Sequence, residues 1–230
     1  MPQGRLLRVP RRPVFVLAII AALVVVGGGR IKPAAAATPP SYHIAVTFTN
    51  VYFTYLDDGC DVLLNCDKDA QLYGEFGAAA HGPSGFTSRG SRVLGHWGSQ
   101  SGWCPGDGVS WWDASYSNAT CFREVGWGLN YNVAQTFLCA SADYRSCAGP
   151  YAKNNNTIVL TVQAGETIGL GSDLIDYDKS SGDDSVCYTN KSFGPYTADQ
   201  LATLNTSGTL YQGFNGFGGC KVSFTLQRVN

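Results

Sequence analysis

After residue 37, this chain shows no apolar repeat of helical period and consists of short runs rich in β-branched and aromatic residues. Glycine, asparagine, aspartate and serine separate the runs, and the chain contains 28 glycines. Alternation of apolar and polar residues is typical of strands that bury one face. Strands are predicted at 43–56, 71–78, 86–97, 125–138, 157–162, 167–175 and 220–229, with a short helix at 197–204. The pattern predicts an all-β fold, an antiparallel β-sandwich.

The N-terminal 37 residues have the organisation of an export signal. Four arginines precede an apolar stretch at 14–26 that is short for a membrane span, and alanines at 34–37 offer cleavage sites. Arg30 and Lys32 lie between the apolar stretch and the alanines, which leaves an uncleaved N-terminal membrane anchor as the alternative. We therefore expect a secreted protein in which residues 38–230 form a single β-sandwich domain.

Removal of the signal makes the chain acidic. Six of the sixteen basic residues lie within 1–37, whereas all seventeen acidic residues lie beyond it. Ten basic against seventeen acidic residues give the mature chain a net charge of −7. Because no basic patch remains to neutralise phosphates, we expect no nucleic-acid partner.

All eight cysteines fall in the exported part of the chain. An even number in an oxidising compartment predicts four disulfides, and no C-x-x-C spacing supports zinc instead. Short intervening loops make Cys60–Cys66 and Cys139–Cys147 the first pairs to test. Four cysteines and all five tryptophans lie at about 80–156, which predicts a disulfide-rich insertion between strands.

The tryptophans of this insertion allow more than one interpretation. Trp111 and Trp112 precede an aspartate, and Trp127 lies among glycines. Exposed rings of this kind stack on sugars or enter a lipid interface. The simpler interpretation is a small aromatic core for a region stapled by disulfides.

Ten of the fourteen aspartates lie in two short segments, 57–69 and 173–184, whereas the chain has only three glutamates. Carboxylates this close repel one another unless a cation neutralises them. Asp176 and Asp178 form a D-x-D pair at a predicted strand end, and Asp184 follows six residues later. Such loops suit Ca²⁺ better than Mg²⁺, and no EF-hand spacing is present. The alternative is two solvated acidic loops that bind nothing.

The segment 174–184 resembles the calcium-dependent lipid-binding C-two domains of synaptotagmin, protein kinase C and perforin. Its three aspartates match the D-x-D-x5-D spacing of one calcium loop of that family, and Asp69 before Tyr73 is similar to the end of the other. The first loop departs from the family in a cysteine-bounded excursion at 60–66. The resemblance implies a C-two-like sandwich whose two loops converge and share Ca²⁺. The metal ligands that it implies are Asp57, Asp58, Asp69, Asp176, Asp178 and Asp184.

No catalytic residues are predicted. No nucleophile motif accompanies His43, His81 or His96, and oxidised cysteines supply no thiolate. We predict a secreted, non-catalytic, calcium-binding module whose partner is an anionic lipid or a surface glycan. A lectin-like carbohydrate-binding module is one alternative. A secreted hydrolase with a carboxylate pair drawn from Glu75, Glu124 and Asp113 is another. The sequence leaves the oligomeric state open.

Overall fold

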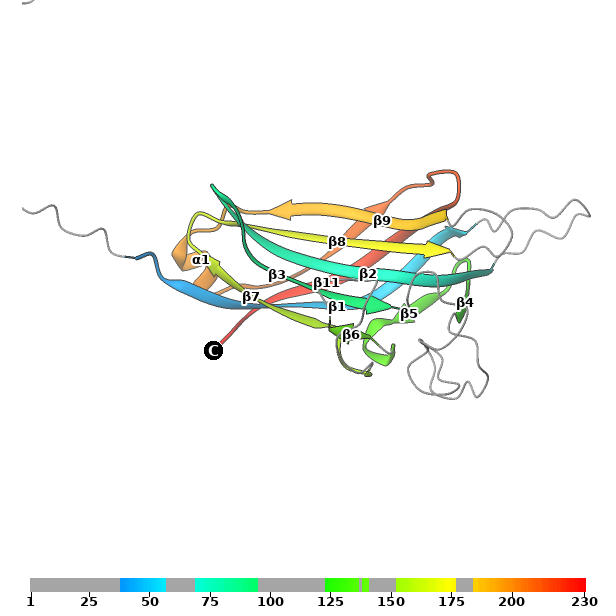
Figure 1. The fold of residues 1–230 in the computed structure, drawn as a ribbon, viewed down its shortest axis with the longest axis horizontal. Helices are drawn as coiled ribbons and strands as arrows, with labels where there is room; N and C mark the ends of the chain where they lie inside the picture. The colour runs from blue at the N-terminus through cyan, green and yellow to red at the C-terminus, as the bar shows by residue number, and fades with distance from the viewer. Residues whose placement is uncertain (1–37, 57–68, 95–122, 137, 141–151, 177–183) are drawn as a thin grey trace, which may run out of the picture. The chain divides into compact units, whose positions relative to one another are not determined.

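A computed structural model describes residues 38–56, 69–94, 123–136, 138–140, 152–176 and 184–230, all within one compact unit, Thr38–Asn230. The predicted all-β sandwich is confirmed, because two antiparallel sheets pack face to face (Figure 1). Among the described residues, no helix has the length and apolar character needed to cross a membrane.

The first sheet is built around one long strand. β1 (Ser41–Leu56) pairs with β11 along one edge, while β7 and β5 share its other edge, and β10 pairs with β11 on the far side. The bounds of these partners are β5 (Asn130–Asn132), β7 (Thr157–Gln163), β10 (Asn205–Gln212) and β11 (Gly218–Val229).

The second sheet is centred on β2 (Asp69–Gly82). β8 pairs with one edge of β2 and carries β9 on its outer side, while β3 and β4 share the other edge of β2, and β6 pairs with β3. The bounds are β3 (Gly85–Leu94), β4 (Arg123–Gly126), β6 (Cys139–Ala140), β8 (Thr167–Asp176) and β9 (Asp184–Phe193). Strands β3 to β6 show that the predicted insertion region contributes to both sheets.

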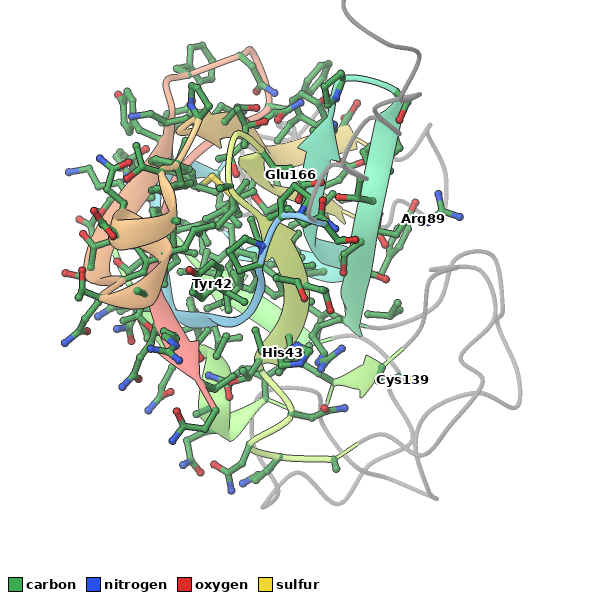
Figure 2. The ribbon with its side chains drawn as sticks, turned by 90° about the vertical axis from the view of Figure 1, so that its left-hand side faces the viewer. Tyr42, His43, Arg89, Cys139 and Glu166 are labelled. Atoms are coloured by element: carbon green, nitrogen blue, oxygen red, sulfur yellow. A yellow bond between two sulfur atoms is a disulfide. The ribbon has the colours of Figure 1, made fainter. Side chains whose placement is uncertain are left out.

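Alternating side chains form the core between the two sheets. On β1, Ile44, Val46 and Phe48 are fully buried, and Phe48 packs against Phe76 of β2 with ring centroids 5.2 Å apart. Two register shifts in the β1–β11 ladder, after Phe48 and after Phe53, keep apolar residues facing inward along the whole strand. Figure 2 shows the side chains that fill the space between the layers.

Polar contacts join the sheets along the seam between β3 and β7. The Arg92 guanidinium on β3 donates to the backbone oxygen of Thr157 on β7, and the backbone N–H of Thr161 donates to Ser88 Oγ at 3.1 Å. Burial lowers the pKa of Arg92. The inner side of this seam is tight, because a Cβ at Gly90 would lie 2.8 Å from the side chain of Ile158.

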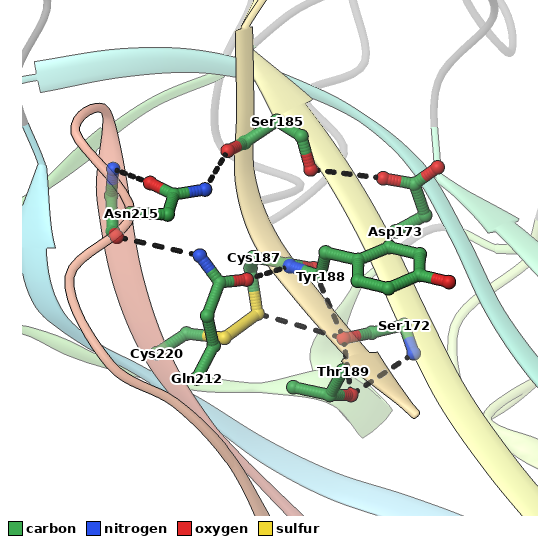
Figure 3. The surroundings of a disulfide bond; sticks show 10 residues. Ser172, Asp173, Ser185, Cys187, Tyr188, Thr189, Gln212, Asn215 and Cys220 are labelled. Carbon is green, nitrogen blue, oxygen red and sulfur yellow. Dashed lines mark hydrogen bonds between the residues drawn. A yellow bond between two sulfur atoms is a disulfide. The ribbon is translucent and has the colours of Figure 1, made fainter. Parts of the chain in front are cut away.

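A disulfide closes the opposite seam, between β9 and the β10–β11 hairpin. Cys187 of β9 is bonded to Cys220 of β11 with a Cα–Cα distance of 5.4 Å, and the Tyr188 backbone N–H donates to the side-chain oxygen of Gln212 (Figure 3). Cys139 is also disulfide-bonded, while its predicted partner Cys147 and the pair Cys60 and Cys66 lie outside the described residues.

The prediction of a single strand at 125–138 is wrong. The run 125–138 divides into β4, β5 and a 3₁₀ turn at Val133–Gln135, because Gly128 adopts a positive φ of 77° and reverses the chain. β9 and β10 were not predicted. The short helix is confirmed as α1 (Ala198–Ala202), which Thr197 and Gln200 cap reciprocally.

We expect the disulfide at this seam to contribute substantially to stability. It closes a loop with a sequence separation of 33 and joins an edge strand to the other sheet. The double variant Cys187→Ala/Cys220→Ala should lower the free energy of unfolding by about 2–4 kcal/mol in urea denaturation. An unchanged midpoint and slope would show that the seam holds without it.

Candidate functional site

The strand ends that flank the two aspartate segments lie at one end of the sandwich. β1 ends at Leu56 and β2 begins at Asp69, while β8 ends at Asp176 and β9 begins at Asp184. Figure 1 shows these four strand ends on the same side. Both acidic segments therefore connect strands at this end.

The structure brings two of the predicted metal ligands together. Asp176 and Asp184 are register partners in the β8–β9 ladder, and Asp176 is only 3% exposed. Asp69 precedes by three residues Leu72, which also pairs with Asp176, so about 10 Å of strand separates the two positions. The remaining predicted ligands, Asp57, Asp58 and Asp178, lie outside the described residues.

Two carboxylates on neighbouring strands provide hard oxygen donors, which fit part of a Ca²⁺ site. Within the ranges that the structure describes, no group of three or more His, Cys, Asp or Glu side chains is placed to hold a metal ion. The calcium site therefore stays a prediction, supported by the pairing of Asp176 with Asp184.

Large aromatic side chains gather on the outer face of the β1 sheet. Tyr211 of β10 and Tyr52 of β1 both pair with Lys221 of β11, so the three form one row across three strands. Tyr211 is 65% exposed and Tyr52 is 37% exposed. The Lys221 ammonium lies 5.9 Å from the centroid of the Tyr52 ring, a cation–π distance. The row thus presents two rings and one cation to solvent.

Three further rings lie beyond this row, toward the end of β1. The Tyr55 ring centroid is 5.3 Å from that of Trp127 and 4.5 Å from that of Phe214. These tilted and edge-to-face arrangements are favourable for aromatic pairs. Trp127 is 46% exposed and Phe214 is 62% exposed. We call Tyr52, Tyr55, Trp127, Tyr211 and Phe214 the aromatic surface.

Backbone hydrogen bonds hold the turn that carries Trp127. The Gly128 N–H donates to the Phe53 carbonyl at 3.0 Å, and the Phe53 N–H donates to the Leu129 carbonyl at 3.3 Å. The turn is therefore attached to the edge of β1, next to the Tyr55 ring that Trp127 contacts.

The β10–β11 hairpin, which carries Phe214, is held by the side chain of Asn215. Its Oδ1 accepts from the backbone N–H groups of Phe217 and Gly218 at 3.0 and 2.8 Å. Its Nδ2 donates to the Ser185 carbonyl of β9 at 2.8 Å, a bond visible in Figure 3. The two segments that carry Trp127 and Phe214 are thus pre-organised, which lowers the entropy cost of binding a partner.

The two glutamates weighed for catalysis lie on different strands. Glu75 of β2 pairs with Asp173 of β8, whereas Glu124 of β4 pairs with Gln71. His43 lies exposed on β1, and His81 of β2 packs against Phe86 with ring centroids 4.3 Å apart. Asp113, His96, Trp111 and Trp112 lie outside the described residues.

Sequence reasoning singled out Trp127 but missed the other four rings. A signal for Tyr52 was present, because an alternation that buries Val51 and Phe53 turns the residue between them outward. Tyr211 lies on β10, which the sequence pattern did not reveal. Its place beside Tyr52 depends on a register that joins residues far apart in the chain.

A search of protein-family models finds none that matches this chain, and a search of curated proteins also finds no match. We therefore infer the function from the geometry of the chain's own residues.

Proposed function

We propose that this protein is a secreted, non-catalytic module that binds a surface glycan through the aromatic surface. The observation that carries the proposal is the aromatic surface. Tyr52 and Tyr211 lie in one row across the β1 sheet, and Trp127 and Phe214 both pack on Tyr55 beyond that row. Rings of this kind stack on the apolar faces of sugars while neighbouring polar groups bind hydroxyls. Lys221 and Asn130 lie in the same cross-strand row as Tyr52 and offer such groups.

Charge favours a glycan over an anionic membrane. The mature chain carries a predicted net charge of −7, which opposes approach to anionic lipid, and Lys221 is the only basic residue in the row of Tyr52 and Tyr211. A polysaccharide with uncharged, flat ring faces meets no such repulsion. We therefore take an uncharged polysaccharide as the ligand class and use cellulose and chitin as probes.

Removal of single rings should weaken binding to the polysaccharide. We expect Tyr211→Ala and Trp127→Ala each to reduce affinity for microcrystalline cellulose or chitin about fivefold, since one stacked ring contributes about 1 kcal/mol. Depletion assays with the insoluble polysaccharide measure this loss.

Val159→Ala is a matched control, because Val159 is 55% exposed on β7 of the same sheet but lies outside the aromatic surface. This variant should bind as the parent does. Wild-type protein that binds phosphatidylserine vesicles, and binds no polysaccharide, would refute the glycan proposal in favour of a lipid partner.

We also propose that Ca²⁺ stabilises the acidic end of the sandwich. Asp176 and Asp184 would contribute to the site, together with the predicted ligands of the two acidic segments. Asp176 and Asp184 are cross-strand partners, so their carboxylates lie on the same face of the sheet. Two like charges in this position favour a bound divalent cation.

Calcium should therefore raise the melting temperature. An ion that binds only the folded state stabilises it by about 2.7 kcal/mol at a hundredfold excess over its dissociation constant. Calorimetry in CaCl₂ and in EGTA should show a shift that Asp184→Asn removes. Asp199→Asn, in the first turn of α1, should keep the shift. The same melting temperature in both buffers would remove calcium from the proposal.

A further inference from the structure

A cavity lies on the outer face of the other sheet, over strands β2 and β8. Its volume is about 490 Å³, within the range of small-molecule sites. The floor consists of two cross-strand pairs, Gly77 with Gly171 and Ala79 with Gly169. We call this cavity the outer hollow.

The space above Gly77 in the floor of the outer hollow is not filled by protein atoms. A Cβ built on Gly77 meets no atom within 4 Å, and the backbone there is ordinary extended strand. At Gly171, by contrast, a Cβ would lie 2.7 Å from the Thr189 carbonyl. Glycine within a strand weakens it and often marks a place where a ligand approaches the backbone closely. Packing within the protein explains the glycine at 171 but not the glycine at 77, where a side chain would have room.

An acidic wall closes one end of the outer hollow. Glu75 and Asp173 are direct cross-strand partners, so their side chains lie on the same face of the sheet. The residues that flank them in this row are Val93 and Tyr188. Asp173 Oδ1 accepts from Ser185 Oγ at 3.2 Å. Like charges placed opposite each other favour a ligand that brings positive charge.

An exposed ring stands beside the acidic pair. Tyr188 pairs with Asp173 and is 57% exposed, and Figure 3 shows the two side chains extending in the same direction from neighbouring strands. One row further along, Asn190 pairs with Gly171 and lines the hollow with an amide. The hollow therefore offers a ring for stacking, an amide for hydroxyl groups and two carboxylates at one end.

Phe86 and His81 line the opposite end of the hollow. Phe86 pairs with His81, which lies six residues along β2 from Glu75. At the rise of a strand, this separates the aromatic pair from the acidic wall by about 20 Å. Arg89 on β3 lines the edge between them, with its side chain directed away from the core (Figure 2). The hollow is thus long enough for an extended ligand with several rings.

We propose that the outer hollow binds an oligosaccharide whose sugars bear primary amines. An ammonium group would lie between Glu75 and Asp173, a sugar ring would stack on Tyr188, and the glycine floor would admit the chain close to the backbone. The site lies on the opposite sheet from the aromatic surface. Binding at the outer hollow can therefore be tested separately from the proposed function.

A matched pair of probes tests the role of charge. The glucosamine trisaccharide and its fully N-acetylated counterpart share the same rings, but only the first is cationic at mildly acidic pH. Isothermal titration of the full chain should show binding of the glucosamine trisaccharide that is at least tenfold tighter. Asp173→Asn should abolish this preference, because asparagine keeps an acceptor for Ser185 and loses the charge. Cellulose or chitin binding through the aromatic surface should not change in this variant.

A substitution in the floor tests the role of space. Gly77→Val places a β-branched residue in an extended strand with room above it, so the melting temperature should stay the same or rise while trisaccharide binding is lost. Gln227→Val is a control, because it adds the same side chain at an exposed position of β11. It should leave trisaccharide binding unchanged.

Three results would overturn the proposal. Equal affinity for the two trisaccharides would remove the role of the acidic wall. A large loss of melting temperature in Gly77→Val would mean that another segment of the chain fills the hollow. Hydrolysis of the trisaccharide, lost in Glu75→Gln, would make the site a glycosidase centre instead of a binding site.

Discussion

The contact between the apolar inner faces of the two sheets decides the rest of this structure. Side chains of a strand alternate between its two faces, so a register that buries Val51 and Phe53 turns Tyr52 to solvent. A slip of one residue would exchange these faces and is excluded by the burial it would lose. The same constraint acts on β2, where Phe76, Ala78 and Ala80 face the core. The composition of each outer face thus follows from the packing inside.

The two outer faces differ in the size of their side chains. Large rings stand on the face of the β1 sheet, whereas the centre of the β2 sheet carries small residues such as Gly77 and Ala79. Each glycine in a strand costs about 0.5–1 kcal/mol relative to alanine, and exposed rings give up the free energy of burial. Both features therefore lower the free energy of unfolding relative to a β-sandwich with ordinary polar outer faces. Departures of this kind are expected where a protein binds something.

The fold was largely predictable from the sequence. Strong alternation of apolar and polar residues marked β1, β7, β8 and β11. β9 and β10 lie at sheet edges and are rich in Asn, Ser and Thr, so the apolar half of that alternation is largely missing from their sequences. The run 125–138 looked like one strand because its apolar residues mask the turn at Gly128. The two proposed binding faces were less predictable. Trp127 attracted attention as a residue type, but the pairing of Gly77 with Gly171 joins strands almost a hundred residues apart, and no local pattern encodes that register.

The disulfide between Cys187 and Cys220 has a mechanical consequence. Each cysteine is the immediate neighbour of a residue of a proposed binding face, Tyr188 at the wall of the outer hollow and Lys221 in the row of aromatic rings. A pull exerted on either face would pass through this covalent cross-link into the opposite sheet and would not peel β9 away from its hydrogen-bonded neighbour. Two ligands held at the proposed sites would therefore load a covalent bond between the sheets and not the hydrogen bonds of a single strand.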